Sequence, residues 1–491
     1  QRFRFRVKKS VMKIKMCILF LVWFLFSSAS FASAAVNVRD FGAIGDGETD
    51  DTEAIERAIS EGKGVVEFPK GDYRITRTIE VDLDEGRRIS LNGQSGSARI
   101  LMAGAGPAFR FIGTHDGTAL ADSFAQGVLS RERMPQITGL EIFGEHPEAD
   151  GLEFIRSMQA VVSRVLIRDV RVGIRLSERN RNVIIDSSHI YNCSGIGVFL
   201  DDVDLHQAII SSSHISYNKG GGIVIRGGSV RNVQITGNDI EYNHDLEAEE
   251  SNDVLIDVSQ GGSIREGTIA SNTIQARYSP GGANVRFRGN REDPAKVGLW
   301  SIAGNHISNQ RVNIHLDSAR GISVSGNNFI LGREQVLLIE NSRHISVSGN
   351  VSDYNPDYYR IGLYHGSENG VRIRNSDGVI VNGLILDGSA QGSSDEGGAI
   401  EILGSKNITI SESQLFNFAH RGIWVADSKN IRIAGNTIGG ESETDAAGSA
   451  ITVIGASERV FLHGNLVSGA DAISAEPGTD VRRSVEELYV P

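Results

Sequence analysis

Two acidic residues near the middle of the chain are spaced so that they could act together. Asp317 and Glu340 each lie five residues before the first apolar residue of a new alternating run, at Ile322 and Ile345. If these runs are stacked strands, the two carboxylates lie about 5 Å apart. Carboxylates at that separation can serve as an acid and a nucleophile, or can share a calcium ion.

Neighbouring basic residues could assist this pair. His315 has a side chain that titrates near neutral pH and could shuttle a proton. Arg374 aligns with Glu340, and Arg372 aligns with Glu401 of the next repeat. Arginine can hold a carboxylate through two hydrogen bonds or stabilise developing negative charge. We therefore predict a catalytic group made of His315, Asp317, Glu340 and Arg374, with a possible calcium site at Asp317 and Glu340.

The elements that must position these residues are repeats of about 23 to 25 residues, seen clearly from 208, 299, 322 and 408. Each repeat holds three short runs of alternating apolar and polar residues, separated by Gly, Asn and Ser. Alternation with period two predicts half-buried strands, and the separating residues predict turns. Three strands per repeat make one triangular coil that stacks on the next. We expect an all-β fold, a single-stranded right-handed parallel β-helix, over residues 89–480.

An asparagine recurs at one turn of these coils, each time after Gly or Ser: Asn238, Asn272, Asn305, Asn327, Asn350, Asn436 and Asn465. Asparagine tolerates a left-handed backbone and can hydrogen-bond to the asparagines above and below it. We interpret these residues as a structural ladder.

The stretch FGAIGDGETDDTEAIERAI, residues 41–59, leads into a helical pattern of apolar residues. Asp50, three residues ahead of Glu53, predicts a capping box, and Gly62 predicts the end of the helix. Such a helix would cover the open end of the solenoid. A metal site is the less favoured alternative, since a full calcium loop is absent; its ligands would be Asp46, Asp50 and Asp51.

The same stretch carries a family resemblance. NVRDFGAIGDGETDDTEAIERAI (37–59), followed by GVVEFPKGDYRIT (64–76), resembles the N-terminal signature of the pectate lyase superfamily, in its rhamnogalacturonase- and epimerase-like form. That superfamily holds pectin-lyase-like β-helix enzymes and also phage tailspikes. The resemblance implies a signature and capping helix at 35–88 and a C-terminal tail at 481–491. The ordered motifs of polygalacturonases are absent, so pectin hydrolysis by their three aspartates is not expected.

In enzymes that this chain resembles, a glycan lies along the outside of one strand stack, between walls made by the turns. Every second residue of the strand after the variable turn forms an outward row of alternating charge here. A solvated strand face is the alternative interpretation of this row. Three long insertions, at 243–253, 354–370 and 386–398, are expected to form the walls. The predicted substrate-binding residues are Arg226, Asp257, Arg286, Arg288, Arg372, Glu401, Trp424 and Tyr364.

A second file of titratable residues competes with this row. His189, His214 and Asp239 recur before the same strand in successive repeats. They belong to a different face of the coil, and we favour a structural side-chain ladder there.

Residues 1–34 have the layout of a secretory signal peptide, with a basic run, an apolar run and small residues at the end. They hold seven of the 49 Lys and Arg and none of the 61 Asp and Glu, which leaves a formal charge of −19 on the remainder. This charge argues against nucleic acid as a partner. The apolar run is too short to span a bilayer. We expect an extracellular or periplasmic protein.

These observations together favour a secreted polysaccharide-active enzyme that cleaves a glycan as a lyase or a glycoside hydrolase. The partner would be a polysaccharide or oligosaccharide, and a lyase could use Ca²⁺. A non-catalytic glycan-binding or adhesive β-helix protein is the alternative. The sequence leaves open whether the protein is a monomer or a trimer.

Overall fold

The computed structural model describes residues 35–62, 64–86, 88–118, 120, 122–357, 367–439, 449–468, 472–484 and 488–490. The expected signal peptide, residues 1–34, and the predicted sugar-binding Tyr364 lie outside the described residues. In the described part of the chain, no helix is long and apolar enough to cross a membrane.

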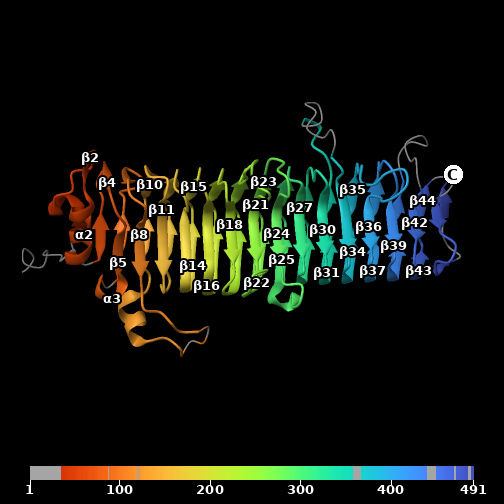
Figure 1. Ribbon diagram of the computed structural model, residues 1–491, viewed down its shortest axis with the longest axis horizontal. Coiled ribbons are helices and arrows are strands. Elements are labelled where there is room, and N and C mark those ends of the chain that lie inside the picture. The colour runs from red at the N-terminus through yellow and green to blue at the C-terminus, as the bar shows by residue number, and fades with distance from the viewer. Residues whose placement is uncertain are drawn as a thin grey trace, which may run out of the picture.

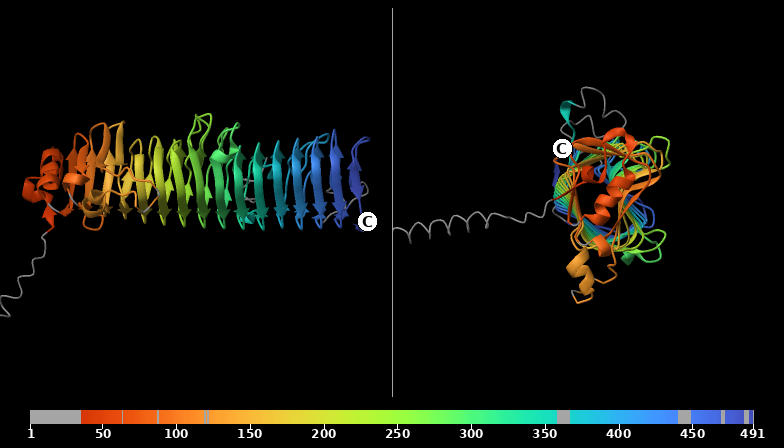
Figure 2. Two further views of the ribbon diagram at one scale, coloured as in Figure 1. Left: turned by 90° about the horizontal axis from the view of Figure 1, so that it is seen from below. Right: turned by 90° about the vertical axis from the view of Figure 1, so that its left-hand side faces the viewer.

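The chain winds into one elongated solenoid whose parallel strands form three stacks (Figure 1). Figure 2 shows the coils from below and along the axis, with the strands of successive coils in line. The parallel β-helix expected from the repeats is confirmed.

The first stack carries the predicted functional row. Its strands are β5 (Ile79–Asp82), β8 (Gly106–Ile112), β11 (Ala149–Ile155), β14 (Ile174–Asp186), β16 (Ile196–Ser211), β18 (Gly221–Arg226), β21 (Asn252–Asp257), β24 (Ala283–Arg288), β27 (Val312–Asp317), β30 (Gln335–Glu340), β33 (Gly370–Arg374), β36 (Ile400–Leu403), β39 (Ile423–Ala426), β42 (Ile451–Ile454) and β45 (Ile473–Ala475).

The second stack follows the first along each coil, and β14 and β16 run through both without a break. Its other strands are β1 (Val36–Asn37), β3 (Val65–Glu67), β6 (Ser90–Asn92), β9 (Gln136–Thr138), β12 (Val161–Ser163), β19 (Ser229–Thr236), β22 (Ser263–Ala270), β25 (Val297–Ala303), β28 (Arg320–Ser325), β31 (Arg343–Ser348), β34 (Asp377–Asn382), β37 (Lys406–Ser411), β40 (Lys429–Ala434), β43 (Glu458–His463) and β46 (Val481–Arg483).

The third stack closes the coils. Its strands are β2 (Asp46–Asp50), β4 (Gly71–Ile75), β7 (Ala98–Met102), β10 (Leu140–Gly144), β13 (Leu166–Arg168), β15 (His189–Tyr191), β17 (His214–Ser216), β20 (Asp239–Glu241), β23 (Thr273–Gln275), β26 (His306–Ser308), β29 (Asn328–Phe329), β32 (Val351–Ser352), β35 (Ile385–Asp387), β38 (Gln414–Phe416), β41 (Thr437–Ile438), β44 (Leu466–Ser468) and β47 (Leu488–Val490).

The parallel stack extends beyond the expected 89–480 at both ends. Strand β3 pairs with β6 and β4 pairs with β7, so coils form before residue 89. At the other end, β44 pairs with β47, within the segment expected to be a tail. Strand pairing therefore begins within the N-terminal signature itself.

One hydrophobic core runs the length of the solenoid, because every second strand residue is apolar and points inward. Ile314 and Leu316 of β27 are fully buried. In the second stack Trp300 fills the space that Gly267 leaves on the adjacent coil, and a Cβ on that glycine would lie 2.5 Å from the indole. Packing of this kind holds the outward side chains in fixed register.

Helix α2 (Thr52–Glu61) lies at the N-terminal end of the solenoid (Figure 1) and buries Ala54, Ile55, Ala58 and Ile59 in the core. The predicted cover for the open end is thus present, and Gly62 follows its last residue. The remaining short helices are η1 (Val38–Phe41), α3 (Leu83–Gly86), the π-helical turn η2 (Val128–Glu132) and η3 (Pro294–Lys296).

The predicted capping box, with Asp50 as the N-cap and Glu53 as its partner, is wrong. Asp51 is the N-cap, and its side chain makes no capping bond but accepts the N–H groups of Ile44 and Gly45 at 2.7 and 2.9 Å. Asp50 instead accepts the backbone N–H of Thr52 at 3.1 Å. These two acids fasten the loop and the helix start, and this use leaves no support for the alternative metal site.

The asparagine ladder is present at the predicted turn. From Asn238 to Asn350, and again from Asn436 to Asn465, each side-chain amide donates to the next asparagine's Oδ1 at 2.9 to 3.1 Å. The left-handed backbone, however, belongs to the residue before each asparagine, such as Gly304 with φ of 62°. In each Gly–Asn pair the glycine therefore adopts the left-handed turn, and the asparagine makes the buried hydrogen bond.

Candidate functional site

Two outward rows cross the strands of the first stack, where the sequence spacing predicted one. One row lies at the carboxyl ends of the strands, and its members are aligned from coil to coil: Asp201, Arg226, Asp257, Arg288, Asp317, Glu340 and Arg374. The other row lies two residues earlier: Arg286, His315, Leu338, Arg372, Glu401 and Trp424. The predicted alignments of Asp317 with Glu340, Glu340 with Arg374 and Arg372 with Glu401 are correct.

Glu340 is the centre of a buried charge network. His315 Nε2 lies 2.9 Å from Glu340 Oε2, and Arg374 pairs with Glu340 Oε1. The hydrogen bond from His315 and the positive charge of Arg374 lower the pKa of Glu340 to about 2, against the opposing effect of burial. Glu340 is therefore a permanently ionised carboxylate at neutral pH, and it cannot act as the proton donor of an acid–nucleophile pair.

His315 does not fit the role of a proton shuttle on the groove surface. Its side chain is 9% exposed, and burial lowers its pKa against the opposing effect of the bond to Glu340. The neutral ring donates from Nε2 and positions Glu340. We assign it a positioning role.

Three of the four carboxylate oxygens of the expected calcium pair already face donor groups. Both carboxylate oxygens of Glu340 face cationic or donor groups, and Asp317 Oδ1 accepts from Ser318 Oγ and Asn341 Nδ2, each at 2.9 Å. No group of three or more His, Cys, Asp or Glu among the described residues could hold a metal ion. A calcium ion would have to displace Arg374, so these residues do not fit the ion well.

Arg286 is also placed differently from its predicted use. Its guanidinium is 7% exposed and donates to Asn252 Oδ1, Glu250 Oε2 and the Gly281 carbonyl. Burial lowers the pKa of Arg286 to about 10. Glu250, from the 243–253 insertion, also pairs with Arg288. These arginines anchor the insertion to the stack, and burial leaves Arg286 little surface to offer a glycan.

One pocket on these rows lies one to two coils beyond Glu340. It has a volume of about 360 Å³. Its walls come from two insertions that were predicted to form walls: Glu368 from 354–370, and Gly392, Ser393, Glu396 and Gly397 from 386–398. Its floor comes from the strands and holds Arg372, Arg374, Glu401, Leu403 and Trp424.

The floor of this pocket is rigidly held. Arg372 Nε donates to Glu401 Oε2 at 2.6 Å, and the Glu401 side chain is 5% exposed. Trp424 is 6% exposed, and the Arg421 guanidinium lies 4.8 Å from its ring centroid. Arg421 covers part of the indole, so Trp424 presents a smaller apolar surface than the sequence suggested.

Glu368 is a functional candidate that sequence reasoning missed. Burial raises the pKa of Glu368, the Glu334 carboxylate adds to this, and Arg372 opposes it. A carboxyl with a raised pKa beside an ionised one is the pattern of a proton donor and its partner. The sequence signal that could have identified Glu368 is its position at the end of a long insertion, two residues before a first-stack strand.

A second pocket, of about 400 Å³, lies further toward the N-terminus on the same rows. It brings together Asp201, Asp202, Arg226 and Asp257. The two pockets lie on the same rows, on either side of the buried network at Glu340.

The competing file of histidines lies on the third stack. The rings of His189 and His214 are stacked with centroids 5.0 Å apart, and His214 Nδ1 lies 3.0 Å from Asp239 Oδ2. Successive members are paired in register. Their contacts are with one another along the stack, which is the geometry of a side-chain ladder.

Comparison with known proteins gives two family matches, and relatives that match only over short segments. The rhamnogalacturonase A/epimerase, pectate lyase-like family matches residues 35–110. Alginate lyase 7 of Azotobacter vinelandii is 54% identical over 44 residues, 8% of this chain and 5% of its own length. Mannuronan C5-epimerase AlgE1 of the same organism is 46% identical over 54 residues, 10% of this chain and 4% of its own. These matches span about a twentieth of the curated relatives.

Among solved structures, the catalytic unit of a GH87 α-1,3-glucanase from Streptomyces thermodiastaticus aligns with 94% of this chain and 70% of its own, at 15% identity and a TM-score of 0.43. The right-handed beta helix region family matches residues 120–274 and 362–481, which is more than half of the chain. The chain therefore belongs to the pectate lyase-like right-handed β-helix proteins.

Proposed function

We propose that this protein is a secreted enzyme that hydrolyses a glycan bound along the two rows of the first stack. The observation that carries the proposal is the 360 Å³ pocket in which Glu368 and Glu401 stand beside Arg372 and Trp424. Two carboxyl groups with opposite environments, next to an aromatic ring, are what glycoside hydrolysis requires.

In this proposal Glu368 is the general acid. Its raised pKa keeps it protonated nearer to neutral pH, so that it can protonate the glycosidic oxygen as the bond breaks. Glu401, buried and paired with Arg372, supplies the negative charge that stabilises an oxocarbenium-like transition state. A solvent water then bonds to the anomeric carbon and gives a proton back to the Glu368 carboxylate. Glu340, one coil before Arg374, holds that arginine in place.

The charge of the pockets favours a neutral glycan. In the first pocket Glu396 and Glu401 balance the two arginines when Glu368 is protonated, and in the second pocket three aspartates outnumber the single Arg226. A polyuronate would therefore meet net repulsion in the second pocket and no net attraction in the first.

A lyase acting on a uronate is the second candidate. Arg372 and Arg374 line one pocket and could neutralise a uronate carboxylate. The relatives that match over short segments include an alginate lyase and a mannuronan C5-epimerase. Since Asp317 and Glu340 fit calcium poorly, we expect that such an activity would not depend on Ca²⁺.

The test is to incubate the purified protein with neutral and uronate polysaccharides, with Ca²⁺ or EDTA, and to follow reducing ends and unsaturated-product absorbance together. Reducing ends without absorbance on a neutral glycan support the proposal. Absorbance would establish the lyase instead. Binding without either product would establish the glycan-binding alternative and overturn the enzyme proposal.

A further inference from the structure

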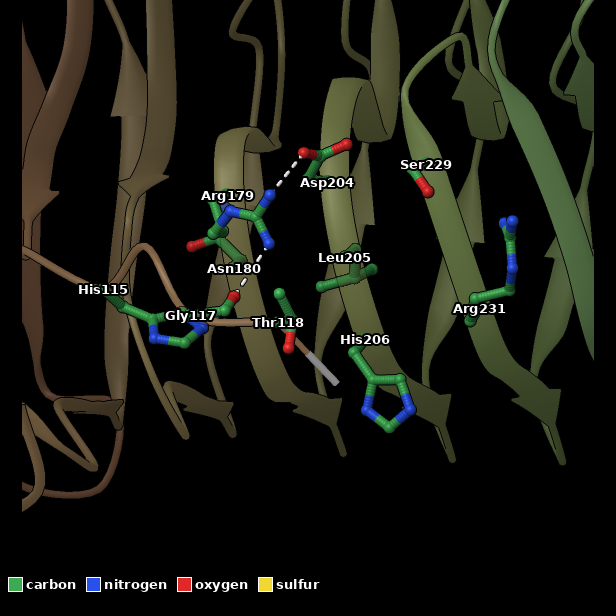
Figure 3. A pocket seen from close by; sticks show the side chains of 10 residues that line it. All are labelled: His115, Gly117, Thr118, Arg179, Asn180, Asp204, Leu205, His206, Ser229 and Arg231. Carbon is green, nitrogen blue, oxygen red and sulfur yellow. Dashed lines mark hydrogen bonds and ion pairs between the residues drawn. The ribbon is translucent and has the colours of Figure 1, made fainter. Parts of the chain in front are cut away.

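A separate pocket lies away from the two rows, where β14 and β16 pass from the first stack into the second. It has a volume of about 240 Å³ and is formed where residues 113–118 fold over β14, β16 and β19. These residues begin an insertion, 113–135, that appears as a lobe beside the solenoid in Figure 1 and that sequence analysis did not single out. Figure 3 shows its lining, with His115 at one end and Arg231 at the other.

The insertion is fixed to the solenoid by arginines that point out of β14. Arg179 donates to the Gly117 carbonyl at 2.8 Å and to Asp204 Oδ2 at 2.6 Å, as Figure 3 shows. Arg181 donates to the Thr118 carbonyl at 2.6 Å and lies over the Phe124 ring. The pocket is therefore a built feature of two segments that are far apart in the sequence.

Arg231 is the charge in this pocket that lacks a counter-ion. No carboxylate lies within ion-pair distance of it among the residues that the structure describes, whereas Arg179 is neutralised by Asp204. Three of its five N–H groups go to the carbonyls of Val230 and Ser263 and to Ser263 Oγ. Nε–H and one further N–H remain for a ligand.

The surroundings of Arg231 add to this excess of positive charge. Arg265 is its register partner on the next coil, and no described acidic residue pairs with Arg265 either. Burial and the Arg265 charge lower the pKa of Arg231, and the charges of Glu266 and Asp204 oppose this. A bound anion would relieve both effects.

Two histidines in the pocket have ring nitrogens without a partner. His115 is 2% exposed, and its Nδ1 has no hydrogen bond within the described part of the chain. His206 lies in register between Arg181 and Arg231, and its Nδ1 is also buried without a partner. Buried ring nitrogens without a protein partner, beside a guanidinium without a counter-ion, favour a bound ligand at this place.

We propose that this pocket binds an oxyanion, either a free inorganic one or the charged group of a single acidic sugar unit. Arg231 donates to it, and His115, His206 and Ser229 complete the shell. The volume is below that of most oligosaccharide sites, so the ligand is a small group rather than a chain. The site is independent of the two rows that we propose to bind the glycan.

The test is calorimetric titration of the full chain with sodium sulfate, sodium glucuronate and glucose at constant ionic strength. We expect saturable millimolar binding of sulfate or glucuronate and none of glucose. Arg231→Gln should weaken the binding by about tenfold or more. Arg320→Gln is the matched control, because Arg320 occupies the same register column outside the pocket and is exposed.

The two anions distinguish the sources of the group. Tighter binding of glucuronate than of sulfate identifies a sugar unit, and the reverse order identifies a free oxyanion; both support the site. Absence of saturable binding, or equal losses in Arg231→Gln and Arg320→Gln, overturns it. If Arg231→Gln fails to fold, the ring NMR signals of His115 and His206 in the unmodified protein decide, since the anion must shift them.

Discussion

His315 and Glu340 are paired across adjacent coils, with Nε2 and Oε2 2.9 Å apart and both side chains about nine-tenths buried. Arg374 closes the other side of the carboxylate. A buried carboxylate held by two donors on neighbouring strands ties three coils together at the middle of the first stack. The charge of Glu340 therefore stabilises the packing of these three coils.

Glu340 should therefore make stability depend on acid pH. Its pKa falls from 4.5 to about 2 on folding, so its contribution is fully present above 4.5 and is lost as the pH falls toward 2. The shift corresponds to about 3 kcal/mol. Glu340→Gln should lower the thermal unfolding midpoint at pH 7 and flatten its decline between pH 4.5 and 2.

Glu80→Gln provides the control for this measurement, because the Glu80 carboxylate is 59% exposed and also pairs with an arginine. It should leave the pH dependence unchanged. Parallel curves for Glu340→Gln and the unmodified protein would show that the titration of Glu340 contributes nothing to stability between pH 4.5 and 2.

Glu368→Gln should abolish hydrolysis without affecting the fold. Loss of a general acid costs about 100-fold or more in kcat, and KM should change little because Arg372 and Trp424 still hold the sugar. The alkaline limb of the kcat profile should disappear. The matched control is Glu396→Gln, which removes an exposed carboxylate of the same pocket.

Asp317→Asn tests the pair that sequence spacing suggested. If Asp317 and Glu340 carry the reaction, this variant loses activity and Glu368→Gln does not. We expect the opposite, with Asp317→Asn retaining most of its kcat. If both variants retained kcat equally, neither pair of carboxylates on the two rows would carry the reaction.

The coil architecture and the alignment of the rows could be predicted because they depend on local periodicity. The five-residue offset of Asp317 and Glu340 from the next apolar run determines which side chains are neighbours, and the structure has that pairing. The same rule placed Arg374 beside Glu340.

Burial and bonding within the rows could not be predicted in this way. Arg286 and Arg288 look alike in the sequence, yet Glu250 and Gly281 come from insertions that cover Arg286 and leave Arg288 partly exposed. The pocket at Glu368 depends on how two insertions fold against each other, and periodicity carries no information on that. The insertion at His115 was missed for the same reason.

Asp253 should make stability fall as the pH rises toward 8. It is fully buried in a second ladder, where it accepts bonds from Asn243 and Asn284. Burial raises its pKa from 3.8 to about 8, although these bonds oppose the shift. Below 3.8 both the folded and the unfolded chain hold the proton; between 3.8 and 8 only the folded chain does, so stability declines across that range.

Asp253→Asn keeps the shape and removes the titration. The variant should show a flatter pH dependence of the thermal midpoint between pH 4 and 8, and should exceed the unmodified protein at pH 9. Asp239→Asn, on the neighbouring coil but partly exposed, is the control. A steeper decline in the variant than in the unmodified protein would contradict the buried titration.

Asn305→Ala should break the principal asparagine ladder and destabilise the centre of the solenoid. The backbone N–H and side-chain amide of Asn272 both donate to Asn305 Oδ1, at 3.0 and 2.9 Å, and both would be left buried without an acceptor. Each orphaned donor costs about 1–3 kcal/mol, so the thermal midpoint should fall clearly. Asn382→Ala, which removes an exposed asparagine bonded to Ser411 on the same stack, should have little effect.

Because coils interact mainly with their neighbours, hydrogen exchange in Asn305→Ala should increase first in the coils around residue 305. Equal stability of the two variants would mean that the ladder is replaceable by water and that apolar packing alone holds these coils in register.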